Sequence, residues 1–184
     1  MSAETKIYEE KMDGVIRHLV KEHATIRAGR ANPAILDRVT VDDYGTPTPI
    51  NQVAAVSVAE ARVLTISPWD ASLMRAIEKA ILTSDIGINP TNDGRIMRLV
   101  FPAPTEERRK QLTKDAQRMG EEAKVAVRNI RRDALDKFKS MKKAGELTED
   151  DLKNLENEMQ KITDKFVKEI DKTCEAKNKE IMEI

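Results

Sequence analysis

Apolar residues recur every three or four positions through both ends of the chain, the spacing that places them on one face of a helix. This pattern predicts helices over residues 3–28, 105–144 and from Thr148 onward, with glycine or proline near each boundary. Each stripe alone is too narrow to form a core, so the three must pack together as a coiled-coil-like bundle. The stripes consist of Tyr8, Met12, Val15, Leu19 and Ile26; Leu112, Ala116, Met119, Ala123, Ile130, Ala134, Phe138 and Met141; and Leu152, Leu155, Met159, Ile162, Phe166, Ile170 and Cys174.

The middle of the chain has a different pattern. Residues 39–41, 53–58, 63–66 and 96–101 are predicted strands, residues 72–83 a short helix, and residues 44–49 a turn-rich stretch. Prolines are concentrated in this region. It therefore predicts a small β-rich α/β domain inserted into the bundle.

The sequence thus predicts an α+β protein of two domains. Residues 1–30 and 105–184 would form a discontinuous, antiparallel three-helix bundle, and residues 31–104 the inserted domain. The chain crosses between the domains twice, once at Arg30 and Ala31 and once at Pro104 and Thr105. We expect these two crossings to lie close together and to form a hinge.

Composition limits the alternatives. Aromatic residues make up 3% of the chain and charged residues 35%, which favours long helices with much surface over a large globular core. The single cysteine, Cys174, excludes an internal disulfide and favours a reducing compartment. No apolar run approaches the ~20 residues of a membrane span, and residues 1–6 lack a signal-peptide core. We therefore expect a cytoplasmic protein.

The formal net charge of +0 hides a strong local imbalance. Residues 105–143 carry 13 basic and 7 acidic side chains, a net charge of +6, whereas residues 144–184 carry 7 and 12, a net charge of −5. Residues 1–30 and 31–104 carry net charges of +1 and −2. Local charge determines what a surface attracts, because salt screens charges beyond about 8–10 Å.

The basic segment places its charges on one side of its helix. The direction of each side chain around the helix axis follows from the turn of about 100° per residue. With the direction of Arg128 set to zero, six other Lys and Arg side chains fall between about −40° and +40°: Lys110, Lys114, Lys124, Arg132, Lys139 and Lys142. Arg131 lies just outside this sector, at about −60°. The apolar stripe lies near about −130°, while Glu121 and Leu135 interrupt the basic face. This face matches a track for a phosphate backbone, although a solvated helix face has the same pattern.

Arg128, Arg131 and Arg132 form the densest part of this face, and the planar guanidinium group suits two-pronged contacts with phosphate. Catalytic signals are weak by comparison. His18 and His23 are five residues apart, which is not the four-residue spacing of a helical metal pair. No glycine-rich phosphate loop is present, so we expect neither an enzyme nor a cofactor or metal site.

Five blocks of sequence form a further pattern: Gly29-Arg30-Ala31-Asn32-Pro33, Tyr44-Gly45-Thr46-Pro47-Thr48-Pro49, Ser84-Asp85-Ile86-Gly87-Ile88-Asn89-Pro90, Thr105-Glu106-Glu107-Arg108-Arg109-Lys110 and Val127-Arg128-Asn129-Ile130-Arg131-Arg132-Asp133-Ala134. In their order and spacing these blocks resemble the ribosome recycling factor family, and the resemblance covers essentially the whole chain. Pro104 departs from the family, where an apolar residue such as leucine is expected.

This resemblance implies an L-shaped monomer that binds large-subunit ribosomal RNA in the post-termination ribosome and, with elongation factor G and GTP, separates the subunits. It implies RNA-facing roles for Arg27, Arg128, Arg131 and Arg132, to which the basic face adds Lys110 and Lys124. Arg30 would be structural at the hinge. The alternatives are a coiled-coil adaptor that binds only proteins and an enzyme that uses the inserted domain.

Overall fold

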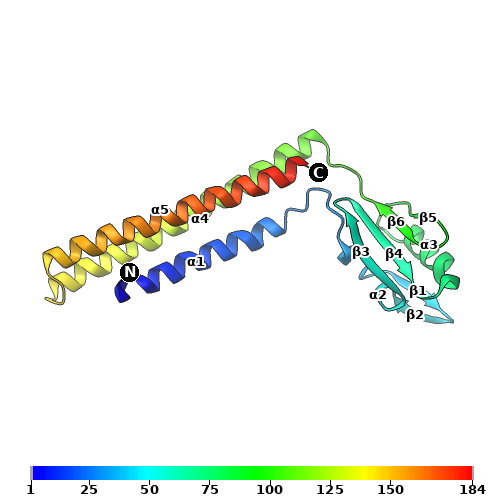
Figure 1. Ribbon diagram of the computed structural model, residues 1–184, viewed down its shortest axis with the longest axis horizontal. Coiled ribbons are helices and arrows are strands. Elements are labelled where there is room, and N and C mark those ends of the chain that lie inside the picture. Colours follow the sequence, from blue (N-terminus) through cyan, green and yellow to red (C-terminus); the bar gives the residue numbers. More distant parts are fainter. Residues whose placement is uncertain (1, 184) are drawn as a thin grey trace. The chain divides into compact units, whose positions relative to one another are not determined.

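The computed structural model describes residues 2–183, which form two compact units (Figure 1). The first unit comprises residues 2–27 and 106–183, and the second comprises residues 28–105. The first contains three long helices that lie side by side: α1 (Ala3–Ala24), α4 (Glu106–Lys143) and α5 (Glu149–Glu183). The predicted three-helix bundle and the α+β class are confirmed.

The apolar stripes of α1, α4 and α5 form one shared core. Met12, Ala116, Val127, Met159 and Ile170 each have 0% of their surface exposed. The ring of Tyr8 on α1 meets that of Phe138 on α4 edge to face, with centroids 5.8 Å apart. Val127 and Ile16 belong to this core although the predicted stripes omitted them.

One backbone carbonyl joins all three helices near one end of the bundle. The carbonyl oxygen of Ala116 on α4 lies 3.0 Å from Nε2 of the buried His23 on α1 and 4.0 Å from Sγ of Cys174 on α5. Because a carbonyl oxygen only accepts hydrogen bonds, Nε2 must carry a proton. His23 thus has a structural role, as its spacing from His18 indicates.

Gly120 allows α4 and α5 to approach at this junction. A Cβ atom at position 120 would overlap Sγ of Cys174 and lie 3.8 Å from Cγ2 of Ile170. The predicted stripe of α4 did not include Gly120, because glycine carries no apolar side chain. Its contribution is the space that it leaves for the facing helix.

The first helix ends four residues earlier than residue 28, the predicted end. After Ala24, the amides of Thr25 and Ile26 donate to the carbonyls of Glu22 and His23, three residues back. The hydroxyl of Thr25 also donates to the Glu22 carbonyl at 2.6 Å. These three-residue bonds tighten the last turn and end the α-helix, so Gly29 lies beyond it.

The turn between α4 and α5 has the predicted boundary signals. Gly145 adopts a φ of +79°, the left-handed conformation common after a helix end. The Asp151 amide donates to Oγ1 of Thr148 at 3.1 Å, and the Thr148 amide donates to the Asp151 carboxylate at 3.0 Å. This reciprocal capping box begins α5 and confirms the predicted N-cap at Thr148.

The second unit combines two small antiparallel sheets with short helices. Strands β3 (Ala54–Glu60), β4 (Val63–Pro68), β6 (Met97–Val100) and β5 (Thr91–Asn92) form a four-stranded sheet in the order β3-β4-β6-β5. A hairpin of β1 (Thr40–Asp43) and β2 (Thr46–Pro49) forms the other sheet. The helical elements are α2 (Ile50–Val53), α3 (Met74–Thr83) and the 3-10 helices Pro33–Leu36 and Ala71–Leu73.

The second unit has its own apolar core. Ile50, Leu64, Ile66, Ile77 and Leu99 have 0% of their surface exposed and belong to one cluster. They come from α2, β4, α3 and β6, so both the four-stranded sheet and the helices contribute. The alternating burial of β6 matches a strand with one face toward the core.

Strand β2 corrects the prediction of a turn-rich stretch over residues 44–49. The true turn is Tyr44-Gly45, where both residues have positive φ (49° and 88°), and the Gly45 amide donates to the Asp42 carboxylate. Pro47 and Pro49 lie within the strand that follows. Prolines fit there because a two-stranded sheet has only edge strands, whose outer amides need no partner.

The second unit contains both connecting segments, residues 28–31 and 102–105, and they touch. Gly29 has a φ of +81°, and a Cβ at this position would lie 2.9 Å from Cδ of Pro104 and 3.2 Å from the Pro102 carbonyl oxygen. The Ala31 amide donates to the Ala61 carbonyl at 2.8 Å. Glycine is therefore required at position 29 both for its backbone conformation and for its lack of a side chain.

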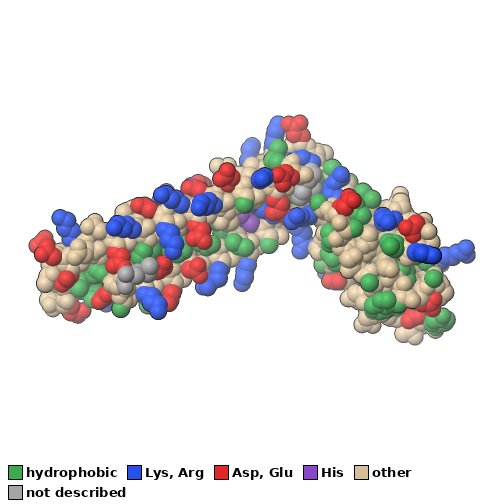
Figure 2. Space-filling view, in the orientation of Figure 1, with side chains coloured by type: hydrophobic (Ala, Val, Ile, Leu, Met, Phe, Trp, Pro, Cys, Tyr) green, Lys and Arg blue, Asp and Glu red, His purple; other side chains and the backbone are tan. Residues whose placement is uncertain are grey.

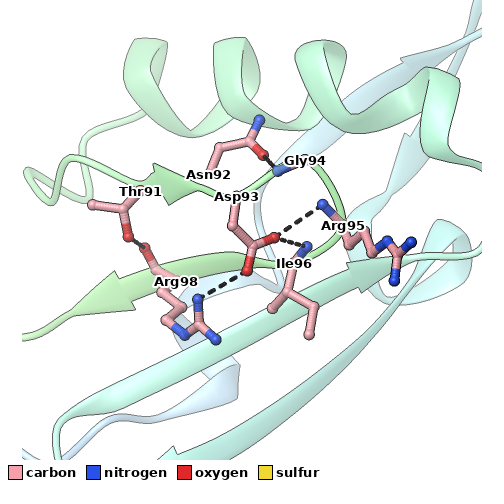
Figure 3. A network of polar contacts seen from close by, with 7 residues as sticks. All are labelled: Thr91, Asn92, Asp93, Gly94, Arg95, Ile96 and Arg98. Atoms are coloured by element: carbon pink, nitrogen blue, oxygen red, sulfur yellow. Dashed lines mark hydrogen bonds and ion pairs between the residues drawn. The ribbon is translucent and has the colours of Figure 1, made fainter.

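The turn between β5 and β6 is organised by one carboxylate (Figure 3). Asp93 accepts backbone hydrogen bonds from Arg95 at 3.0 Å and Ile96 at 2.8 Å, and its other oxygen lies 3.1 Å from a guanidinium nitrogen of Arg98. The Ile96 and Arg95 amides, and the Arg98 cation, lower the pKa of Asp93 from its usual 3.8. The charged carboxylate therefore stabilises this turn.

We predict that Gly120→Ala lowers the free energy of unfolding of the bundle by about 1–2 kcal/mol, because overpacking outweighs the higher helix propensity of alanine. Adding Cys174→Ala should recover much of that loss, since it removes the atom that the new methyl group meets. Chemical denaturation of both single variants and the double variant measures the coupling. Stability of Gly120→Ala at or above wild type would contradict the close approach.

We also predict that Asp93→Asn lowers the thermal stability of the second unit at neutral pH. A carboxylate whose pKa is lowered by folding stabilises the protein above its unfolded pKa, near 3.8, and loses that contribution as pH falls through the folded value. The difference in Tm between wild type and variant should therefore shrink as the pH falls below 3.8. A difference that stays constant down to pH 2 would rule out the charge as its cause.

Candidate nucleic-acid interface

The predicted basic face of α4 contains two arginines that are free to bind an anion. Arg128 and Arg132 are exposed, and neither forms an ion pair with any residue of the described range 2–183. The α4 backbone beneath them is fixed by the buried Val127 and Ala134. Their guanidinium groups therefore project from a rigid helix into solvent.

Arg131 differs from its two neighbours, because the structure turns it toward α5. It is half-buried, and its guanidinium group donates to Oε1 of Gln160. Gln160 in turn donates to Asp164 at 2.9 Å. Nε of Arg131 is buried and has no partner among the described residues, so an outside acceptor could reach it only if the side chain moved.

Lys124 is held between two acids rather than offered to solvent. Its Nζ lies 2.6 Å from Asp171 on α5 and 3.1 Å from Glu121 on α4, and its side chain is only 16% exposed. The hydrogen bonds to Asp171 and then Glu121 raise its pKa above the usual 10.5. Lys124 therefore links α4 to α5, which the sequence pattern did not reveal.

Lys110 and Arg27 lie away from the central arginines. Lys110 is exposed and pairs with Glu106 at 3.1 Å, one helical turn earlier. Arg27 is exposed and lies beyond His23, which faces Ala116. At ~1.5 Å per residue, Ala116 lies about 18 Å from Arg128 along the axis of α4, so Arg27 and Lys110 lie toward one end of the bundle. The basic face thus has a central arginine group and a second group near the end of the bundle.

The residues named as a hinge all belong to the connecting segments. Arg30 and Thr105 are exposed, Ala31 is buried and Pro104 contacts Gly29. Arg30 lies outside the bundle unit that carries the arginines of α4. The structural role at the hinge that we expect for Arg30 stays a prediction.

Acidic side chains lie close to the basic ones along the bundle. Figure 2 shows Lys and Arg interleaved with Asp and Glu over much of the visible face. Some of these basic groups are neutralised locally, as in the pairs Arg118–Glu122 and Lys142–Glu149. Arg128 and Arg132 belong to the group without an acidic partner among residues 2–183, and they differ from the unpaired lysines in having planar guanidinium groups one helical turn apart.

Groups that could carry catalysis are not brought together. Within residues 2–183, no three His, Cys, Asp or Glu side chains are placed to hold a metal ion. Burial raises the pKa of the Cys174 thiol, which keeps it protonated and weakly nucleophilic at neutral pH. His18 is exposed and lies 3.6 Å from Glu22.

No described helix has an apolar stretch long enough to cross a membrane.

The fold and this surface define an α+β protein in which a three-helix bundle presents arginines and an inserted α/β unit has its own core. The sequence model of the ribosome recycling factor family matches residues 19–182. The chain belongs to the ribosome recycling factor family, as the five sequence blocks indicated.

Full-length relatives support the same conclusion. The chain is 58% identical to the ribosome-recycling factor of Caldicellulosiruptor bescii, with 100% of both chains covered. It is 60% identical to that of Acetivibrio thermocellus, covering 98% of this chain and 99% of the relative.

Solved structures agree with the sequence relatives. A solution structure of a ribosome recycling factor has a TM-score of 0.58 at 35% identity and covers 100% of both chains. A second match, at 43% identity and a TM-score of 0.55, covers 97% of this chain and 96% of the other. That match comprises models of the T. thermophilus ribosome recycling factor and the E. coli elongation factor G bound to the E. coli post-termination complex.

We predict that Lys124→Gln destabilises the bundle while Arg128→Gln does not. Removing Lys124 leaves Asp171 without its 2.6 Å partner, and because the Asp171 side chain is 58% exposed, the loss should cost about 0.5–1 kcal/mol. Because folding raises the pKa of Lys124, its charge stabilises the folded state at pH values below the unfolded pKa of 10.5. This stabilisation is lost as the pH rises through the pKa of the folded state. Urea denaturation at pH 7 should show the difference, and equal stability of the two variants would contradict this assignment.

Proposed function

We propose that this protein acts as a ribosome recycling factor in the cytoplasm. It binds the post-termination ribosome through large-subunit ribosomal RNA and, together with elongation factor G and GTP, promotes separation of the subunits and release of messenger RNA. The observation that carries the proposal is the pair of exposed arginines, Arg128 and Arg132, which have no ion-pair partner among residues 2–183 and project from a rigid helix. Membership of the family supports it.

Phosphate contacts explain why arginines on a packed bundle suit this task. Such contacts contribute affinity without reading sequence, so they can grip an RNA backbone over several turns of helix. The bundle is fixed by a continuous core, and force applied elsewhere on the protein would reach the RNA through it. Arg27 and Lys110 would extend the contact toward one end of α4, with Arg131 beside the central pair. Lys124 would act by holding α5 in place.

We further propose that the bundle, residues 1–30 and 105–184, and the inserted residues 31–104 act as separate domains. Arg30, Ala31, Pro104 and Thr105 would form the connection. The separate apolar cores of the two units support this division. The inserted domain would then serve as the part that elongation factor G acts upon, while the bundle stays on RNA.

The arginine contact predicts a specific loss of ribosome binding. Arg128→Gln with Arg132→Gln should weaken binding to large subunits and reduce the slope of log affinity against log salt by about 1.4–1.8, the value for two lost phosphate contacts. The charge-matched control is Lys21→Gln with Lys137→Gln, two exposed lysines without ion pairs among the described residues. Subunit splitting by elongation factor G and GTP should fall in parallel. Normal binding by the arginine variant would favour an adaptor that contacts only proteins.

The proposal also predicts that the protein hydrolyses no nucleotide by itself. Any GTP consumed in the splitting assay would be hydrolysed by the elongation factor, because the described residues offer no phosphate loop or metal cluster. Phosphate release should be measured with the recycling factor alone, with the elongation factor alone, and with both on ribosomes. Hydrolysis by the protein alone that a point substitution abolishes would refute the non-enzymatic assignment.

A further inference from the structure

Helix α5 sorts its lysines onto one face, although its net charge is negative. It carries seven lysines and eleven acidic residues. At about 100° per residue, and with the buried Met159 at zero, five lysines fall between about 180° and 240°. This sector points directly away from the core. The five are Lys161, Lys165, Lys168, Lys172 and Lys179.

Three of these lysines are free of acidic partners. Lys165 lies 3.4 Å from Glu9, and Lys179 lies 3.7 Å from Glu183. Lys161, Lys168 and Lys172 are exposed and form no ion pair with any residue between 2 and 183. We call these three the lysine row. Together with Lys165, they line a shallow depression bordered by Asp164 and Glu169.

The lysine row is separate from the arginine surface of α4. On the side of α5 that faces α4, Asp171 binds Lys124 and Asp164 accepts from Gln160, which holds Arg131. At about 120–140°, these two acids separate the two basic surfaces, and the cation nearest to them, Lys124, is already occupied by Asp171. A single phosphate chain following the arginines would have to cross this strip, which offers no free cation, to reach the lysine row. The lysine row therefore suits a second anionic partner segment.

The geometry of the row is fixed by the core beneath it. Met159 and Ile170 have 0% of their surface exposed, so the backbone of α5 cannot shift without disturbing the bundle. At ~1.5 Å per residue, Lys161 and Lys168 are about 10 Å apart along the axis, and Lys168 and Lys172 about 6 Å. Cations at intervals of this size suit a partner that carries many closely spaced negative charges, as the phosphate backbone of a nucleic acid does.

The chemistry of this face does not favour a protein or a membrane. Protein interfaces are enriched in aromatic residues, methionine and arginine, and depleted in lysine. Helices that lie on membranes add large apolar side chains to their basic residues. In the described part of α5, Met182 is the one large apolar side chain that is highly exposed, and it lies beyond the row.

We propose that Lys161, Lys168 and Lys172 form a second contact surface for a ribosomal RNA backbone, distinct from the arginine surface of α4. The inference rests on the proposed function and extends it, because the bundle would be held between two RNA segments. Two contacts on different sides of a bundle resist rotation about its axis. A single row of contacts on one side does not.

The test replaces the row with glutamine in the full-length protein. Binding of Lys161→Gln/Lys168→Gln/Lys172→Gln to isolated large ribosomal subunits is measured from about 50 to 200 mM salt. Loss of three phosphate contacts should reduce the slope of log affinity against log salt by about 2.1–2.7 and weaken binding roughly ten-fold. The matched control is Lys21→Gln/Lys137→Gln/Lys153→Gln, which removes the same charge from exposed lysines without ion pairs in the described chain.

Combination with the arginine variant separates this inference from the proposed function. If the surfaces are independent, the slope changes of the lysine and Arg128→Gln/Arg132→Gln variants should add. A lysine variant that binds like its control, while the arginine variant is weakened, would overturn the second surface and leave the proposed function intact. Normal subunit binding with impaired splitting would also overturn it, in favour of a protein partner. Wild-type binding without salt dependence would overturn both.

Discussion

Joint burial of three apolar stripes is the interaction on which the bundle depends. Helix α1 contributes Met12, Ile16 and Leu19, too little apolar surface to hold a 22-residue helix in water by itself. Packing against α4 and α5 removes these side chains from solvent, at about 1.5–3 kcal/mol for each large one. Since α1 precedes the inserted unit and the other helices follow it, the core also requires the two connecting segments to return to neighbouring positions.

The same core determines which charges are available for binding. A bundle of three helices buries only one face of each, so the remaining faces can differ in charge without affecting the fold. On α4 the outward face presents Arg128 and Arg132, and on α5 it presents the lysine row. Between them, Lys124 and Asp171 join the two helices by an ion pair of 2.6 Å. A protein with no net charge can in this way carry strongly cationic surfaces.

Close approaches of backbone are the second constraint, and glycine provides them in both units. Gly120 lets α4 and α5 meet beside Cys174, and Gly29 lets one connecting segment pack against Pro104 of the other. At position 104, where we expected an apolar residue such as leucine, the ring of the proline packs against Gly29. The connection that we propose between the domains is therefore a packed structure and not a pair of loose loops.

The sequence by itself determined the three-helix bundle, the inserted α/β unit, the capping box at Thr148 and the placement of Arg128 and Arg132 on one face of α4. These follow from local periodicity and local backbone chemistry, which neighbouring residues set. Only the tertiary structure decided that Lys124 and Arg131 turn toward α5, that His23 binds the Ala116 carbonyl and that β2 is a strand despite two prolines. Each of these depends on a partner distant in the chain, or on the absence of a neighbouring strand. A helical wheel gives the direction of a side chain but not what it meets there.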